Sequence, residues 1–194
     1  MFYQPKDGHG LPHNPFSAIV APRPIAWIST RGSLGDNLAP YSFFNAVAYS
    51  PPQIMFASTG IKDTLRNIRE TGVFAVNITS AALFEAMSAT SATLPRGTDE
   101  FEAAGVARAA CTLIPAPRVA GAPATLECRA LQEVALAGRD NIMTIAEVIG
   151  IHLRDDCVID GRFDITRFHP MARAGYQDYA RVDALITLTR PDEM

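Results

Sequence analysis

The feature that most limits the possible folds is a pair of long β-like segments, residues 124–137 and 142–154, joined by the turn residues Gly138-Arg139-Asp140-Asn141. Long segments separated by a short turn that contains Gly, Asp and Asn are typical of an antiparallel hairpin. The large apolar residues of the second segment fall on one face, with Glu147 as the exception: Met143, Ile145, Ile149, Ile151 and Leu153. Asp160-Gly161 is a further hairpin signal. We therefore expect a mainly β fold.

The first half of the chain alternates shorter strands with helices. We expect strands at residues 17–21, 25–30, 53–58 and 73–78, and the prolines near residue 22 keep the first two apart. Residues 62–72 predict a helix, because Asp63 can cap its start and Gly72 can adopt the left-handed conformation at its end. Ser80 and Thr98 precede two further helices. Seven or so strands with inserted helices indicate an antiparallel barrel.

The chain of 194 residues is long enough to bury a hydrophobic core. It contains no internal repeat, low-complexity segment or linker. We therefore expect one domain over residues 1–194, with an irregular N-terminal arm to about residue 16 and a C-terminal tail over about residues 169–194.

Composition and spacing argue against several classes of function. The formal net charge of −3, with no basic stripe, argues against a nucleic-acid-binding protein. The first ten residues lack a signal-peptide pattern, and no apolar stretch is long enough to span a membrane, so we expect a cytoplasmic protein. Neither a Gly-x-Gly-x-x-Gly nor a Gly-x-Ser-x-Gly sequence occurs, which argues against a Rossmann fingerprint and a serine hydrolase.

The cysteines and histidines give no spacing typical of a metal site or a disulfide framework, and we expect neither. Cys111, Cys128 and Cys157 are widely separated, and we interpret them as buried small apolar side chains. The histidines are scattered, and we expect His152 to be exposed on the face of its strand opposite the apolar residues.

Three features could together form one site for a phosphate and a flat ring. Ser29-Thr30-Arg31 ends a strand and enters a glycine-rich turn. Residues 37–45 mix apolar and aromatic side chains with amides and hydroxyls, as a flavin ring and its polar pyrimidine edge require. Lys62-Asp63-Thr64 begins a helix, whose free N–H groups and dipole favour an anion. Each feature alone is more often structural, and the hypothesis depends on their combination.

These segments resemble a known family in the same order. RPIAWISTRG (residues 23–32), NLAPYSFFN (37–45) and KDTLRNI (62–68) are similar to the flavin reductase-like family with the FMN-binding split-barrel fold, which includes flavoredoxin and the reductase components of two-component monooxygenases. The strong resemblance covers roughly residues 17–78, and the later strands fit the same barrel in order and length.

The resemblance implies a six-stranded antiparallel Greek-key barrel, a homodimer, and FMN at the barrel edge near the dimer interface. It implies that the isoalloxazine and ribityl groups meet Trp27, Ser29 and Thr30. Further contacts to the flavin would come from Asn37, Ala39, Pro40, Tyr41 and Ser42. The phosphate would be held by Lys62 and Thr64, with Arg31 as a second cation. A C-terminal approach to the flavin or substrate would involve His169, Arg173 and Tyr176.

The resemblance favours an FMN-dependent oxidoreductase that uses NADH or NADPH to reduce flavin or another small acceptor, with an oxygenase or redox protein as a partner. Short-chain members carry a histidine that contacts nicotinamide in the turn between the two late strands, whereas this chain has Gly138-Arg139-Asp140-Asn141 there. The hydride donor therefore stays open, and we assign no catalytic residue. The alternatives are a flavoredoxin-type electron carrier without a small-molecule substrate and a dimeric binding module that has lost flavin.

Overall fold

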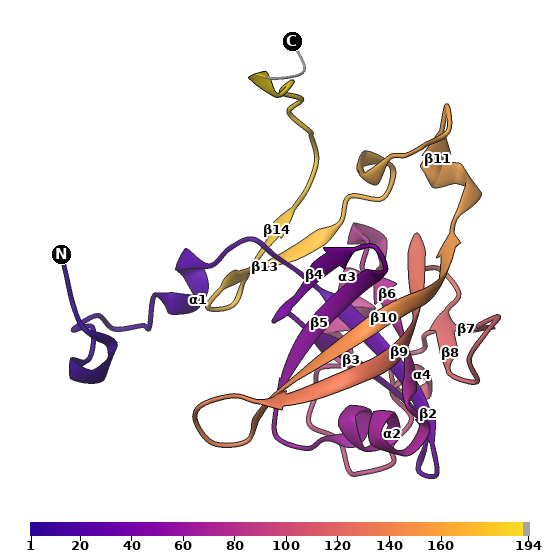
Figure 1. Ribbon diagram of the computed structural model, residues 1–194, viewed down its shortest axis with the longest axis horizontal. Coiled ribbons are helices and arrows are strands. Elements are labelled where there is room, and N and C mark those ends of the chain that lie inside the picture. Colours follow the sequence, from indigo (N-terminus) through magenta and orange to yellow (C-terminus); the bar gives the residue numbers. More distant parts are fainter. Residues whose placement is uncertain (192–194) are drawn as a thin grey trace.

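The computed structural model describes residues 1–191, which are built around one antiparallel sheet of seven strands in the order β3-β2-β6-β9-β10-β5-β4. The sheet curls so that β3 lies against β5 without a hydrogen-bonded ladder between them, which leaves the barrel open along one seam (Figure 1). The strands are β2 (Ala26–Gly32), β3 (Gly35–Tyr41), β4 (Phe44–Tyr49), β5 (Pro52–Thr59), β6 (Val73–Ile78), β9 (Ala124–Ala135) and β10 (Asn141–Leu153). The expected mainly β barrel with helical insertions is confirmed, with seven strands in the sheet instead of six.

Short strands form three smaller sheets, which pair β1 (Arg23–Pro24) with β13 (Met171–Gly175) and β14 (Asp178–Arg181), β7 (Arg108–Ala110) with β8 (Pro117–Val119), and β11 (Val158–Ile159) with β12 (Arg162–Phe163). The α-helices are α1 (Phe16–Ile19), α2 (Asp63–Thr71), α3 (Phe84–Ala89) and α4 (Glu100–Ala103). The 3-10 turns are Pro5–Asp7, Ala81–Leu83, Asp155–Cys157 and Ile165–Arg167. No helix within residues 1–191 is long and apolar enough to cross a membrane.

The predicted long hairpin is present as β9 and β10. The face of β10 that carries most of its large apolar residues points away from the barrel interior. Thr144, Ala146 and Val148 are the buried residues of β10, whereas Ile151 and Leu153 are exposed. The interior opposite β10 is already filled by large rings, so only small or medium side chains fit there. The residues between them point outward, because successive side chains of a strand lie on opposite faces of the sheet.

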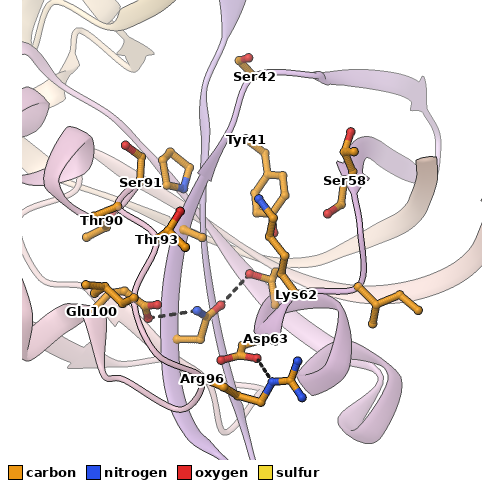
Figure 2. Close-up of a pocket in the computed structure, with 18 of the residues that line it drawn as sticks. Tyr41, Ser42, Ser58, Lys62, Asp63, Thr90, Ser91, Thr93, Arg96 and Glu100 are labelled. Carbon is orange, nitrogen blue, oxygen red and sulfur yellow. Dashed lines mark hydrogen bonds and ion pairs between the residues drawn. The ribbon is translucent and has the colours of Figure 1, made fainter. Parts of the chain in front are cut away.

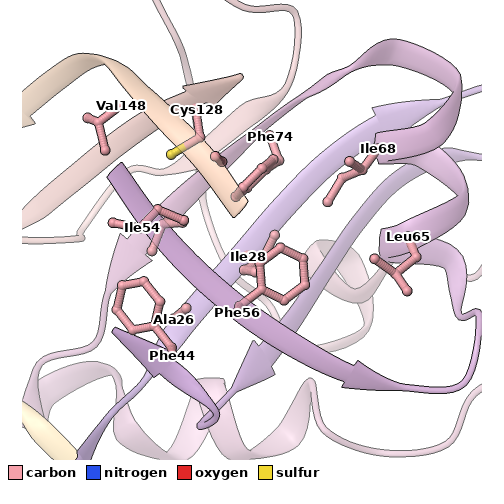
Figure 3. Packing of buried hydrophobic residues seen from close by; sticks show 12 residues of the cluster. Ala26, Ile28, Phe44, Ile54, Phe56, Leu65, Ile68, Phe74, Cys128 and Val148 are labelled. Carbon is pink, nitrogen blue, oxygen red and sulfur yellow. The ribbon is translucent and has the colours of Figure 1, made fainter. Parts of the chain in front are cut away.

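The barrel interior is filled by aromatic and branched side chains from β2, β4, β5, β6 and α2 (Figure 3). Phe56 and Phe74 pack edge to face, with ring centroids 5.5 Å apart. A second cluster lies outside the barrel, where α3 and α4 cover β2 and β3, and it contains Trp27, Leu38, Met87 and Phe101. Helix α2 closes one end of the barrel through Leu65 and Ile68, which places its first turn at the seam.

Two local predictions differ from the structure. Residues 17–21 do not form a strand; helix α1 begins after Pro15, and Asn14 Oδ1 accepts the Phe16 N–H at 3.0 Å. This helix packs closely on β13, since a Cβ at Gly175 would lie 2.7 Å from Ala18. Helix α2 is capped by Lys62 instead of Asp63, while Gly72 ends it in the left-handed conformation (φ 74°) as expected.

Candidate functional site

A cavity of about 600 Å³ lies at the open seam of the barrel, between β3 and β5 and above the first turn of α2. The segment of residues 90–96 and Glu100 of α4 close its other side (Figure 2). This volume lies within the range of small-molecule sites, which is about 300–1,000 Å³. The sheet and helix therefore position the walls of the cavity, and a loop completes it.

Seven of the residues expected at a flavin lie in this wall. They come from two of the three predicted segments, β3 with the residue after it and the start of α2: Asn37, Ala39, Pro40, Tyr41, Ser42, Lys62 and Thr64. The structure thus brings together residues that are about 20 positions apart in the sequence.

The first predicted segment lies elsewhere, because its side chains are buried in the body of the protein. The indole Nε1 of Trp27 donates to Thr90 Oγ1 at 2.9 Å, in the cluster outside the barrel. Ser29 Oγ donates to the carbonyl of Pro117 at 2.6 Å, and Thr30 Oγ1 accepts from Asn67 at 3.0 Å. None of these three side chains lines the cavity, because β2 is the second strand from the seam and its hydroxyls are used within the fold.

Arg31 lies at the far end of β2, where its guanidinium pairs with Asp36 at 2.6 Å. The hydrogen bond to Asp36 raises the pKa of Arg31 above its ordinary value. Asp36 also pairs with Arg108 at 3.2 Å. Arg31 therefore stabilises the β2–β3 hairpin and lies outside the wall of the cavity.

The three expected C-terminal residues lie around the β13–β14 hairpin and make contacts within that region. His169 Nδ1 lies 3.0 Å from Asp183 Oδ1. Arg173 donates to the carbonyl of Tyr176, and its guanidinium lies 4.4 Å from the ring centroid of Tyr179. These residues are not brought to the cavity within the described part of this one chain.

Sequence reasoning missed one whole wall of the cavity. Residues 90–96 run as Thr-Ser-Ala-Thr-Leu-Pro-Arg, and the neighbouring wall of β5 contributes Ser58. The available signal was the density of Ser, Thr, Pro and Gly between two helices, which marks a loop. Loops positioned by a rigid scaffold often carry binding groups, so this composition could have directed attention to the segment.

A chain of hydrogen bonds runs along the floor of the cavity (Figure 2). Thr64 Oγ1 donates to Asn37 Oδ1 at 2.6 Å, and Asn37 Nδ2 donates to Glu100 Oε2 at 3.0 Å. The N–H of Leu38 donates to the same carboxylate oxygen at 3.0 Å. Burial raises the pKa of Glu100 above its ordinary value despite these donors. The hydrogen of the Thr64 hydroxyl is therefore committed to Asn37.

Tyr41 contributes a buried hydroxyl to the cavity wall. Its ring packs on Phe56 with centroids 5.0 Å apart, and its hydroxyl lies near the side chains of Thr64 and Ser58 without a hydrogen bond of good geometry to either. Burial raises the pKa of Tyr41, so the phenol stays protonated at neutral pH and can donate. A buried hydroxyl without a partner is unfavourable by about 1–3 kcal/mol, which a ligand acceptor would offset.

The start of α2 supplies positive charge and free donors to the same cavity. The first N–H groups of a helix lack intrahelical partners, and the helix dipole places partial positive charge there. Lys62 is the N-cap residue, and Arg96 approaches from the loop, 3.5 Å from Asp63. The carboxylate of Asp63 also accepts the Gly97 N–H at 2.9 Å, which fastens the loop over the helix. This end of the cavity is suited to an anionic group.

Comparison with known proteins connects this geometry to a family. The flavin reductase-like domain matches residues 19–166, which include the seven-stranded sheet and all of the cavity wall. A protein of Deinococcus radiodurans without an assigned activity is 46% identical over 154 residues, covering 74% of this chain and 67% of that protein.

Two solved structures share both the fold and more than a quarter of the sequence. The 2-nitrobenzoate 2-nitroreductase of Pseudomonas fluorescens has a TM-score of 0.83 and 31% identity, covering 92% of this chain and 90% of that one. Component B of nitrilotriacetate monooxygenase from Bacillus cereus has a TM-score of 0.89 and 27% identity, covering 97% and 98%. Both alignments cover more than nine-tenths of this chain.

Proposed function

The chain belongs to the flavin reductase-like domain family, and from this premise we propose that it is an oxidoreductase that binds FMN in the seam cavity. Family membership supports a flavin cofactor and a redox role. The choice of FMN, the position of the flavin and the identity of the electron donor are our proposal.

One observation carries the proposal: a helix start that carries Lys62 and a buried phenol without a well-formed hydrogen bond converge on one cavity of suitable size. The N-terminal turn of α2 with Lys62 forms the anionic end, and Tyr41 lies in the wall between β3 and β5. FMN combines a phosphate with a ring that carries polar edge atoms, so the molecule matches both features. The residues present therefore fit the cofactor.

We assign separate tasks to the residues of this wall. The N–H groups of the first turn of α2, together with Lys62, hold the phosphate. Tyr41 donates its hydroxyl hydrogen to a ligand acceptor, and Ala39 and Pro40 give the ring an apolar surface. The bound flavin supplies two-electron transfer, while the protein provides binding, orientation and electrostatics. The loop of residues 90–96 excludes water from one side.

We propose NADH or NADPH as the hydride donor, and flavin or another small molecule as the acceptor. One relative supports a small acceptor, because it is a 2-nitrobenzoate 2-nitroreductase. Another is component B of a monooxygenase, which supports an oxygenase as a partner.

We also propose that the chain forms a homodimer. The outward faces of β4 and β10 expose large apolar side chains, with Tyr49 99% and Ile151 58% exposed. The N-terminal arm and the C-terminal tail extend away from the barrel and expose Phe2 and Ile186 (Figure 1). Burying such surfaces against a second copy would remove apolar area from water. Sedimentation should give twice the chain mass, and a monomer at micromolar concentration would contradict the dimer.

The decisive test is flavin binding followed by anaerobic reduction. The purified protein, reconstituted with FMN and freed of excess, should retain flavin absorption. Addition of NADH or NADPH without oxygen should bleach it within seconds to minutes. Failure to bind FMN would reject the proposed function. Bleaching by a reduced protein donor but by neither nicotinamide would reject the reductase and favour the electron carrier.

A further inference from the structure

A second cluster of reactive side chains lies on the outer surface of the barrel, where the segment after β7 crosses β9 and β10. It consists of Cys111, Glu127 and His152, whose ligand atoms all lie within 4.8 Å of one another. Glu127 and His152 are held by two paired strands, and Cys111 comes from the segment that covers them. Their positions in the sequence show no metal-binding spacing, because the three meet only through the fold.

The shape of the sheet creates this cluster. The residues across from Glu127 on its two neighbouring strands are Ala75 and Gly150, so the carboxylate lies in a shallow pit. Leu113 covers the pit, and a Cβ at Gly150 would lie only 3.1 Å from its Cδ1. Glu127 is buried with 1% of its side chain exposed, whereas His152 retains 24%. The expectation of an exposed His152 is thus corrected: its ring folds over the pit.

The pit holds a carboxylate where an apolar side chain would pack more simply. The N–H groups of Thr112 and Leu113 donate to Glu127 at 2.6 and 2.7 Å, and His152 Nε2 lies 2.5 Å from Oε1. These contacts hold the carboxylate and the imidazole in place, and their ligand atoms lie within 4.8 Å of the Cys111 sulfur. The result is one sulfur, one nitrogen and one oxygen donor that face each other at the edge of the solvent.

We propose that Cys111, Glu127 and His152 form a binding site for a divalent transition-metal ion, with Zn²⁺ as the preferred ion. Thiolate, imidazole and carboxylate are the three ligand types of protein zinc sites, whereas Ca²⁺ and Mg²⁺ require oxygen ligands. Bonds of about 2.0–2.3 Å in a tetrahedron separate ligand atoms by about 3.3–3.8 Å. The three donors reach those separations by side-chain movements of about 1 Å.

The charges of the three ligands also balance the charge of Zn²⁺. A thiolate and a carboxylate carry two negative charges and a neutral imidazole carries none, so Zn²⁺ gives a neutral site. Binding releases the thiol proton to solvent, and the imidazole takes the neutral tautomer that carries its hydrogen on the ring nitrogen facing away from the ion. Three protein ligands leave a fourth position for water, and the exposed edge of His152 provides the route for the ion. The bound ion would fasten residues 111–114 to β9 and β10, independently of flavin.

Co²⁺ is the probe, because its visible spectrum reports sulfur ligation and tetrahedral geometry. The full chain with bound FMN is freed of metal with a chelator and titrated with Co²⁺, and absorption is followed in the red, where oxidised flavin is transparent. We expect one equivalent of Co²⁺ per chain to give tetrahedral bands that Zn²⁺ abolishes. The bands should be lost in Cys111→Ser and in His152→Gln, and retained in the matched control Cys157→Ser.

Absence of tetrahedral bands in the wild-type protein would overturn the proposal and leave Glu127 and His152 as a hydrogen-bonded pair that fastens a loop. Bands that persist in Cys111→Ser would overturn the assignment of this site. Thermal unfolding provides a second readout: Zn²⁺ should raise the midpoint of the wild type and of Cys157→Ser, but not of Cys111→Ser. Equal shifts in all three proteins would also reject the site.

Discussion

Two clusters of buried polar side chains differ in how completely their hydrogen-bonding groups are used. In the first, Asn77 Nδ2 donates to the Trp27 carbonyl at 2.9 Å and to Ser29 Oγ at 3.0 Å. Its Oδ1 accepts the Val119 N–H at 2.8 Å and Thr125 Oγ1 at 3.1 Å. The amide therefore joins β2, β6, β8 and β9 and has no capacity left for a ligand.

The second cluster, at the seam, is incomplete. The Tyr41 hydroxyl makes no hydrogen bond of good geometry among residues 1–191, and both donors to Glu100 use the same oxygen, Oε2. Buried polar groups in folded proteins are nearly always hydrogen-bonded, so an unsatisfied group in a cavity wall retains the capacity to bind a ligand. Polar side chains on neighbouring strands can therefore either stabilise the fold or face a ligand. The two roles differ in whether the hydrogen-bonding groups of the side chains are already occupied within the protein.

The largest effect should come from breaking the complete cluster. Asn77→Leu leaves the Val119 N–H and the Thr125 hydroxyl without their acceptor and removes a donor from Ser29 Oγ, and should lower the free energy of unfolding by about 3–5 kcal/mol. Urea unfolding measures this loss. Asn45→Ala on the exposed edge strand is the control and should change it by less than about 0.5 kcal/mol. A loss below about 1 kcal/mol for Asn77→Leu would contradict the structural role of the cluster.

Lys62→Ala should weaken ligand binding without changing the stability of the fold. Loss of one charge-assisted contact to phosphate should weaken FMN binding about tenfold, which corresponds to about 1.4 kcal/mol. Binding of riboflavin, which lacks the phosphate, should stay within about twofold of the wild type. Flavin fluorescence quenching measures both affinities. Lys6 is the only other lysine of the chain, and Lys6→Ala is the matched control. An equal loss of riboflavin affinity would remove the phosphate assignment.

Tyr41→Phe should have opposite effects on stability and on binding. Removing a buried hydroxyl that lacks a partner should raise the free energy of unfolding of the flavin-free protein by about 1 kcal/mol. The same change should weaken FMN binding by about threefold to tenfold, since a donor to the ligand is lost. Tyr49→Phe, at a tyrosine that is 99% exposed, should change neither quantity. Lower stability without weaker binding would mean that the hydroxyl has an internal partner.

The smallest effect concerns pH. Burial raises the pKa of Glu100 in the folded protein, so the unfolded chain loses this proton first as pH rises. Between the ordinary pKa of about 4.3 and the higher folded value, this group therefore makes the free energy of unfolding fall with rising pH. Glu100→Gln should remove that contribution, as seen in urea midpoints between about pH 4 and pH 7. An unchanged pH profile would mean that the carboxylate is solvated in the folded state.

Much of the fold could be predicted because local signals and tertiary packing agree. The Gly138–Asn141 turn between long β segments gave the β9–β10 hairpin, and Gly72 gave the end of α2. The direction of the β10 face was not predictable by periodicity, because alternation shows that two faces differ but not which one meets the core. The strand predicted at residues 17–21 was wrong, because the capping contact from Asn14 and the close packing on Gly175 favour a helix there.

The candidate site could likewise be predicted only in part. Residues 37–42 and 62–64 could be identified because their resemblance extends through adjacent positions that the fold keeps together. Ser29 and Thr30 belong to the same family motif, but they serve packing, since Asn77 and Asn67 occupy their hydroxyls. Which member of a motif touches a ligand depends on distant partners such as Pro117. Such partners cannot be read from the motif itself.

The open seam has a consequence for how a ring could be recognised. β3 is an edge strand, so half of its backbone N–H and C=O groups have no strand to pair with, and the Leu38 N–H already turns to a carboxylate. The pyrimidine edge of a flavin alternates donors and acceptors, much as a peptide backbone does. A flavin seated there would act as a short substitute strand and complete the barrel at the position where the chain leaves it unfinished.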